Sequence, residues 1–268
     1  MPPSTFQSQL SRRSEGLAGV IEVRGILGNT VSDLGIRIVG GEWAPGQGIP
    51  KEADLCAEMG VSRTVIREAF RIIGAKGLIR SRTSDGTRVQ PRSEWRLLDP
   101  DVMDWRIKAR DTKSLLEDLL KVRLVLEPGI VFEATNSASE SARERVRAAM
   151  EWKRDVYRTP DTQYAKRRTR FIDSDLEFHR ALLASVESDL LLQLFAVIEA
   201  ALSLLLDLQM NAVGYKTEMI GMEESHELHE AVFLEFEKRD AKAAELAMRH
   251  LIERAIRDAR NGFEGLGR

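Results

Sequence analysis

Histidines and one carboxylate are the residues of this chain whose types and spacing could bind a metal. All four histidines lie in the second half of the sequence, at His179, His226, His229 and His250. Asp175 lies four residues before His179, and residues four apart share one face of a helix. A carboxylate and several imidazoles that converge between helices can bind a divalent transition metal. The spacing also fits ordinary core or surface histidines, so both interpretations stay open.

Arg123 is a second residue with distinctive chemistry, because it lies in a largely apolar stretch over residues 119–126. A guanidinium presents paired donors that fit a carboxylate. That carboxylate could belong to a bound ligand, or to Glu127, which follows four residues later. The residues alone leave both partners open.

Two arginines near residue 65 indicate a different chemistry. Arg63 and Arg67 lie four residues apart, so they share a helical face, and small polar residues precede them. Arginine is the commonest reader of guanine, through two parallel donors. The alternative is an amphipathic helix with solvated arginines.

The segment before these arginines favours the DNA-binding interpretation. Residues 49–59 resemble a short helix, and Gly60 fits a turn into a second helix. Helix, tight turn and helix form the helix-turn-helix motif, whose second helix places its first residues against base edges in the major groove.

A β-hairpin is expected directly after the second helix. Residues 78–81 and 87–90 are short β-like runs, and the Asp85-Gly86 pair between them favours a tight turn. A hairpin in this place is a wing. Residues 63–92 hold eight basic and two acidic residues, and such a local excess attracts DNA phosphates.

Length, charge and composition limit the remaining possibilities. The 268 residues suffice for two domains, and the net charge of -2 hides a basic front part and an acidic remainder. The single cysteine, Cys56, excludes an intramolecular disulfide framework. The sequence has no apolar run long enough for a membrane span and no signal-peptide pattern, so we expect a cytoplasmic protein without a membrane partner.

The overall pattern predicts a mainly α fold with two domains. Apolar residues repeat at helical spacing through most of the chain beyond residue 101, which favours a bundle of six or seven helices. We expect a mobile N-terminal tail over residues 1–22, a winged helix-turn-helix domain over 23–91, a linker over 92–101 and an all-helical domain over 102–262.

The N-terminal part closely resembles the GntR superfamily of winged-helix transcription regulators. The matching residues span about 50 positions: Gly40 to Gly46, Ile49-Pro50, Glu52, Leu55, Val61 to Thr64, Arg67 to Ala69, Lys76 to Ile79, Gly86-Thr87 and Val89. The resemblance implies that Arg63, Thr64 and Arg67 contact DNA, with Ser62 and the wing residue Gly86 touching its backbone. Ala53 and Asp85 depart from the family pattern, and both changes remove attraction for phosphate.

The C-terminal part resembles the FCD ligand-binding domain of the FadR subfamily. The matching elements are Val122-Arg123, Glu127-Pro128, Asp175 with His179, His229 with Asp240, and an alanine-rich last helix. The resemblance implies an organic acid near Arg123 and a divalent ion, such as Zn, Ni or Mn, held by Asp175, His179 and His229.

The fourth metal ligand of that family falls one residue after His250, where this chain has Leu251. One residue corresponds to about 100° of helix rotation. We include His250 as a candidate ligand that requires a small adjustment of the helix.

Together these features predict a ligand-responsive transcription regulator, and not an enzyme. The likeness to sugar-acid regulators of the subfamily implies a repressor of aldonate or uronate catabolism that the acid releases from double-stranded operator DNA. A homodimer is expected, since a two-fold protein matches a near-palindromic operator. The alternatives are a metal-dependent enzyme that uses the Asp/His cluster, a regulator that responds to another organic acid, and a constitutive architectural DNA-binding protein.

Overall fold

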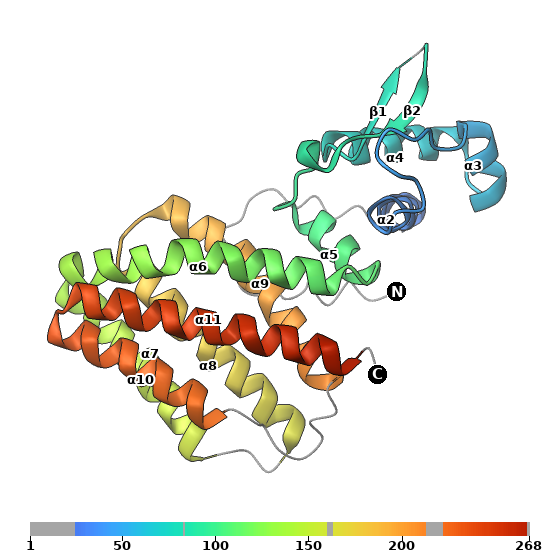
Figure 1. The fold of residues 1–268 in the computed structure, drawn as a ribbon. Coiled ribbons are helices and arrows are strands. Elements are labelled where there is room, and N and C mark those ends of the chain that lie inside the picture. Colours follow the sequence, from blue (N-terminus) through green and yellow to red (C-terminus); the bar gives the residue numbers. More distant parts are fainter. Residues whose placement is uncertain (1–24, 83, 160–162, 213–221, 267–268) are drawn as a thin grey trace. The chain divides into compact units, whose positions relative to one another are not determined.

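The computed structural model describes residues 25–82, 84–159, 163–212 and 222–266 (Figure 1). The tail expected over residues 1–22 lies outside the described residues. The chain forms two compact units, Met1–Leu115 and Leu116–Arg268.

The first unit is a winged helix-turn-helix, as the sequence predicts. Its elements are α2 (Gly25–Val39), α3 (Glu52–Met59), α4 (Arg63–Ala75), β1 (Ile79–Arg82) and β2 (Gly86–Val89). The strands pair antiparallel, with Ile79 opposite Val89 and Arg82 opposite Gly86. Gly60 ends α3 with a φ of 65°, a left-handed conformation that glycine adopts without strain.

The sequence of α4 fixes which of its faces meets solvent. Ile66, Phe70 and Ile73 recur at helical spacing and are buried in the core of the first unit. Ser62 caps the helix, since its side chain accepts a hydrogen bond from the Val65 backbone N–H at 3.4 Å. The polar start of α4 therefore faces solvent.

The expected linker is held against the first unit. It contains the short helix η1 (Arg92–Glu94) and leads into α5 (Pro100–Lys108). The Arg96 N–H donates to the Lys76 carbonyl at 2.9 Å, and the Lys76 ammonium lies 2.8 Å from carboxylate oxygens of Asp99 and Asp101.

Helix α5 also packs with the first unit, although the sequence analysis placed residues from 102 onward in the helical domain. Val102 and Trp105 belong to the same buried core as α4. A Cβ atom built on Gly35 of α2 would lie 2.4 Å from the Trp105 ring, so the indole needs the glycine beside it. The functional domain boundaries stay predictions.

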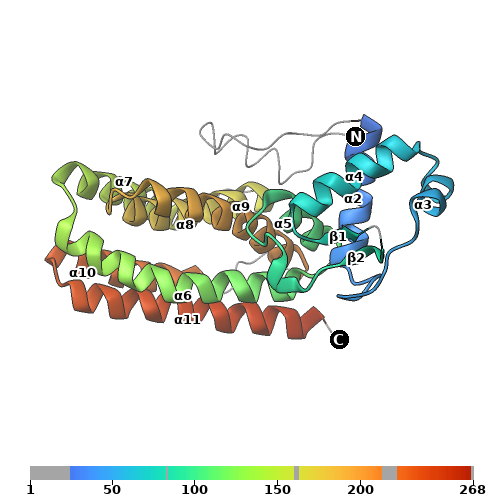
Figure 2. The ribbon, with the colours of Figure 1, turned by 90° about the horizontal axis from the view of Figure 1, so that it is seen from above.

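The second unit is helical throughout its described residues. Its helices are α6 (Thr112–Ser137), α7 (Glu140–Arg158), α8 (Tyr164–Ala184), α9 (Asp189–Ala212), α10 (Met222–Lys238) and α11 (Ala241–Leu266), of which α6 begins in the first unit. Helices α7 and α8 lie side by side, as do α10 and α11 (Figures 1 and 2). This matches the bundle of six or seven helices that the sequence predicts. Within the described residues, every helix is too short or too polar to cross a membrane.

Candidate metal centre and DNA-binding surface

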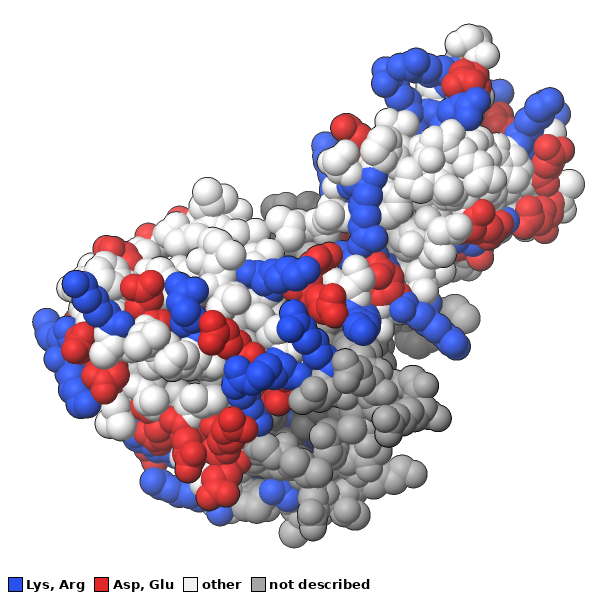
Figure 3. All heavy atoms as spheres, in the orientation of Figure 1, with Lys and Arg blue, Asp and Glu red and all other residues white. Residues whose placement is uncertain are grey.

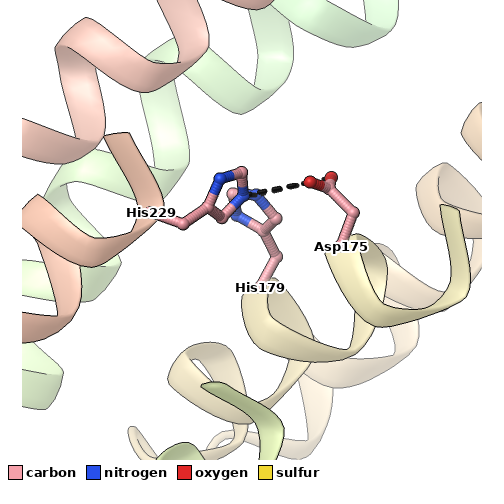
Figure 4. Close-up of side chains that lie close together, drawn as sticks. All are labelled: Asp175, His179 and His229. Atoms are coloured by element: carbon pink, nitrogen blue, oxygen red, sulfur yellow. Dashed lines mark hydrogen bonds and ion pairs between the residues drawn. The ribbon is translucent and has the colours of Figure 1, made fainter. Parts of the chain in front are cut away.

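Asp175, His179 and His229 meet in the interior of the second unit. The first two share one face of α8, and His229 reaches them from α10 (Figure 4). The His229 Nε2 atom lies 3.0 Å from Asp175 Oδ1 and 3.3 Å from His179 Nε2, and His179 Nε2 lies 3.9 Å from Asp175 Oδ2. Two ligands that each lie about 2.1 Å from one ion are roughly 3.0–3.4 Å apart. Both contacts of His229 Nε2 fall in this range, whereas the His179–Asp175 pair is wider at 3.9 Å; the three side chains lie close enough together to hold one divalent ion.

The other nitrogen of each ring lies close to an oxygen atom. The His229 Nδ1 atom lies 2.6 Å from the Ser225 carbonyl oxygen, and His179 Nδ1 lies 2.7 Å from Glu127 Oε2. A carbonyl can only accept, so Nδ1 of His229 carries the hydrogen and the Nε2 lone pair of the neutral ring faces Asp175. The hydrogen bond from Nδ1 orients the His229 ring as the rings of metal-binding histidines are oriented.

The electrostatics of the cluster favour the ligating forms. Burial, together with the nearby Lys153 charge, lowers the pKa of His229 to about 4. Burial alone would raise the pKa of Asp175, but the nearby Lys153 charge outweighs burial and holds the pKa well below its usual value. A neutral imidazole and an ionised carboxylate are the forms that bind a metal.

Arg123 pairs with Glu127, which is one of the two partners that its sequence context allowed. Both side chains are buried; the Arg123 Nε donates to Glu127 Oε1, and Nη2 lies 3.3 Å from Oε2. Burial would raise the pKa of Glu127, but the Arg123 charge outweighs it, and the pKa falls to about 2. An effector role for Arg123 stays a prediction.

Lys153 of α7 is a member of the cluster that the sequence analysis missed. Its side chain is only 3% exposed, and Nζ donates to Asp175 Oδ1 at 2.7 Å. The signal was present: Val146, Met150 and Val156 define the buried face of α7, and Lys153 falls on it. A lysine with charged neighbours in the sequence is more often exposed to solvent, so the burial of Lys153 was not predicted.

His250 does not join the cluster, which corrects its inclusion as a candidate ligand. Its side chain is exposed on α11, and Leu251 is buried in the core instead. The register of the alanine-rich helix explains the difference, because the apolar residue takes the inward position. Among the described residues, the metal-binding group consists of three side chains.

The predicted DNA-contacting residues gather at the exposed start of α4. Arg63, Thr64 and Arg67 are exposed, and Ser62 is exposed at the cap. Arg67 Nε lies 2.9 Å from Glu52 Oε2 on α3, a solvent-exposed ion pair. This arrangement presents two guanidinium groups along one accessible helix face.

The wing carries positive charge beside α4. Lys and Arg side chains gather around the β1–β2 hairpin in Figure 3. Gly86 begins β2 with a φ of 72° and is exposed. Asp85, the residue that departs from the family pattern, lies 2.6 Å from Arg88 Nε, so it offsets part of this charge.

Comparisons with known proteins agree with both halves of the structure. Residues 29–89 match the model for bacterial regulatory proteins of the gntR family, and residues 118–254 match the FCD domain. The galactonate operon transcriptional repressor of Escherichia coli (strain K12) is 32% identical over 230 residues, covering 85% of this chain and 93% of that protein. The Uxu operon transcriptional regulator of the same strain is 26% identical, covering 83% of this chain and 80% of that protein.

A solved structure supports the fold independently. The structure of Lar, which controls the expression of the Listeria monocytogenes agr system, superimposes with a TM-score of 0.52 at 15% identity, over 89% of this chain and 98% of that chain. The family match at both ends and the relative of similar length exclude an enzyme that merely shares a helical bundle. This chain belongs to the GntR family of bacterial regulatory proteins, in the FadR subfamily with an FCD domain, and is a DNA-binding transcription regulator.

Proposed function

We propose that this regulator is a repressor of sugar-acid catabolism that an aldonate or uronate releases from operator DNA. The observation that carries the proposal is the buried cluster of Arg123, Glu127, Lys153, Asp175 and the two histidines inside the helical unit. Such a polar interior offers cations and imidazoles that can bind the carboxylate and hydroxyl groups of a small acid. The galactonate operon transcriptional repressor, to which this chain is 32% identical, supports this class of effector.

Asp175, His179 and His229 are proposed to hold one divalent ion, with Zn, Ni and Mn as candidates. Three protein ligands leave coordination positions open, and a bound ion there would accept a carboxylate or hydroxyl oxygen of the acid. The two nitrogen ligands favour a transition metal over Mg or Ca.

Arg123 is proposed as a fixed anchor for the carboxylate of the acid. A guanidinium has five N–H groups, and Glu127 accepts from only two of its nitrogens. The Arg123 side chain is held in place by this pair, so little entropy would be lost when a second carboxylate binds beside it.

At the DNA end, two copies of the chain are proposed to bind a near-palindromic operator in the cytoplasm. Arg63, Thr64 and Arg67 would meet base edges, while Ser62 and Gly86 would touch the backbone. Binding of the acid need only favour one arrangement of the two DNA-binding units, with a coupling free energy of about 1–3 kcal/mol.

Binding of sugar acids to the isolated regulator tests this proposal. We would titrate a panel of aldonates, uronates and non-sugar carboxylic acids by calorimetry, and follow each acid by chromatography for turnover. We expect one sugar acid to bind at one per chain, to raise the melting temperature and to remain unchanged. Binding of only a non-sugar acid would move the effector to another class, and turnover of the acid would contradict the regulator assignment.

A further inference from the structure

Lys153 and the proposed metal ion meet at the same carboxylate, that of Asp175. The Lys153 ammonium donates to Asp175 Oδ1 at 2.7 Å, and that same oxygen lies 3.0 Å from Nε2 of His229. Nζ also lies 5.0 Å from the centre of the Phe171 ring, one helical turn before Asp175 on α8. The lysine is therefore held at the edge of the ligand cluster by two contacts on the facing helix.

The Lys153 ammonium compensates the negative charge of Asp175, as the Arg123 guanidinium compensates that of Glu127. An ionised carboxylate in a protein interior is costly unless a cation or several donors accompany it. Buried Glu127 and partly buried Asp175 each have a buried cation at contact distance, Arg123 and Lys153 respectively. The cluster thus has internal charge compensation before any ion is added.

A divalent ion that binds Asp175 meets two obstacles from this lysine. It must share the Asp175 carboxylate with the ammonium or displace the ammonium, and it must approach a like charge in an environment where charges interact more strongly than in water. Both effects oppose metal binding. Neither depends on a particular metal, so both apply to any candidate ion.

We propose that Lys153 competes with the divalent ion for Asp175 and thereby sets the metal affinity of the cluster. Metal binding then displaces the ammonium from the carboxylate, and the regulator binds its metal reversibly. This inference rests on the metal site proposed above.

The test compares metal affinity in the dialysed full-length chain and its Lys153 variants. Zn²⁺, Ni²⁺ and Mn²⁺ are each titrated calorimetrically against a competing chelator. Lys153→Met and Lys153→Gln should bind metal on the order of 10–100-fold more tightly, the range over which outer partners tune metal sites. Lys153→Arg keeps the charge and should stay near the wild-type affinity.

Arg147→Met is the matched control on the same helix. Arg147 pairs with Glu237 at 2.8 Å and with Glu140, so its removal deletes one cation of α7 outside the cluster. Its metal affinity should equal that of the wild type.

The melting temperature gives a second measurement. Without metal, Lys153→Met should have a lower melting temperature than the wild type. Added metal should raise the melting temperature of Lys153→Met by more than it raises that of the wild type.

Different outcomes separate this inference from the metal site itself. Unchanged or weaker metal binding in both neutral variants overturns the competition. Adding His179→Ala to Lys153→Met should abolish the tight binding. Tight binding that survives this double substitution, or a failure of every variant to bind any of the three ions, overturns the metal site and the inference with it.

Discussion

Glu127 links two parts of the buried cluster, because it pairs with Arg123 and lies beside Nδ1 of His179. Removing one partner of a buried ion pair leaves an uncompensated charge, which costs about 3–5 kcal/mol. We expect Arg123→Met and Glu127→Leu each to lower the free energy of unfolding by about that amount. The double variant should lose clearly less than the sum. Urea unfolding of the metal-free protein measures all three, and strictly additive losses would contradict the pairing.

His179 and His250 make a direct contrast between a buried and an exposed histidine. After loading with Zn²⁺ or Ni²⁺, His179→Ala should lose the bound ion and its stabilising effect, since an ion bound only by the folded state raises the melting temperature. His250→Ala should keep both. Metal content and thermal unfolding are measured for both variants. Loss of the ion from His250→Ala would show that His250 is a ligand after all.

The residues of the site were only partly predictable from the sequence. Asp175 and His179 share a face because of their spacing, and their meeting with His229 rested on family resemblance. The ion pair of Arg123 with Glu127 was one of two open alternatives. Lys153 and the exposure of His250 depend on helix register and on packing between helices, which local patterns do not determine.

Helices α2 and α5 approach closely where Gly35 meets Trp105. An added Cβ would lie 2.4 Å from the ring, and such overpacking costs typically about 1–3 kcal/mol, more than the helix propensity gained by alanine. Gly35→Ala should therefore destabilise the first unit. Gly74→Ala is the control, because its Cβ would meet its nearest neighbour at an ordinary 3.6 Å. Equal stability of the two variants would contradict the packing of α5 on α2.

Helix α4 is expected to carry the sequence-specific contacts to DNA. Arg63→Ala and Arg67→Ala should each weaken specific operator binding by about 1–3 kcal/mol, as the loss of a base contact does. Arg145→Ala removes the same charge from an exposed position in the helical unit and should have little effect. Fluorescence anisotropy with operator and unrelated DNA measures these affinities. Normal operator binding by both folded α4 variants would refute the assignment of this helix.

The types of the helices and strands were predictable from the sequence, whereas the packing between them was not. Gly60 and the Asp85-Gly86 pair have local conformational meaning, so the helix-turn-helix and its wing were predictable. The apolar residues of α5, above all Trp105, show only that the helix is buried somewhere. Its packing against α2 depends on the space left by Gly35, which is a tertiary property.

At the scale of the whole molecule, α6 is the helix that runs from the first unit into the second. It begins at Thr112 within the first unit and continues to Arg123 and Glu127 in the second. Just before it, Asp111 accepts from Arg106 at 2.7 Å and from Arg92 at 3.1 Å, which ties the start of α6 to the first unit. We predict that an acid bound at Arg123 acts on the DNA-binding unit through α6.

The central claim is that a sugar acid bound in the helical unit lowers affinity for operator DNA. The most direct measurement is the operator dissociation constant, determined by anisotropy at fixed salt and metal, with and without a saturating aldonate or uronate. At least one such acid should weaken operator binding about tenfold or more, corresponding to about 1.4 kcal/mol. Arg123→Lys, which lacks the paired donors, should bind operator normally and respond poorly. An operator affinity that no sugar acid changes, although one of them binds the protein, would contradict the account.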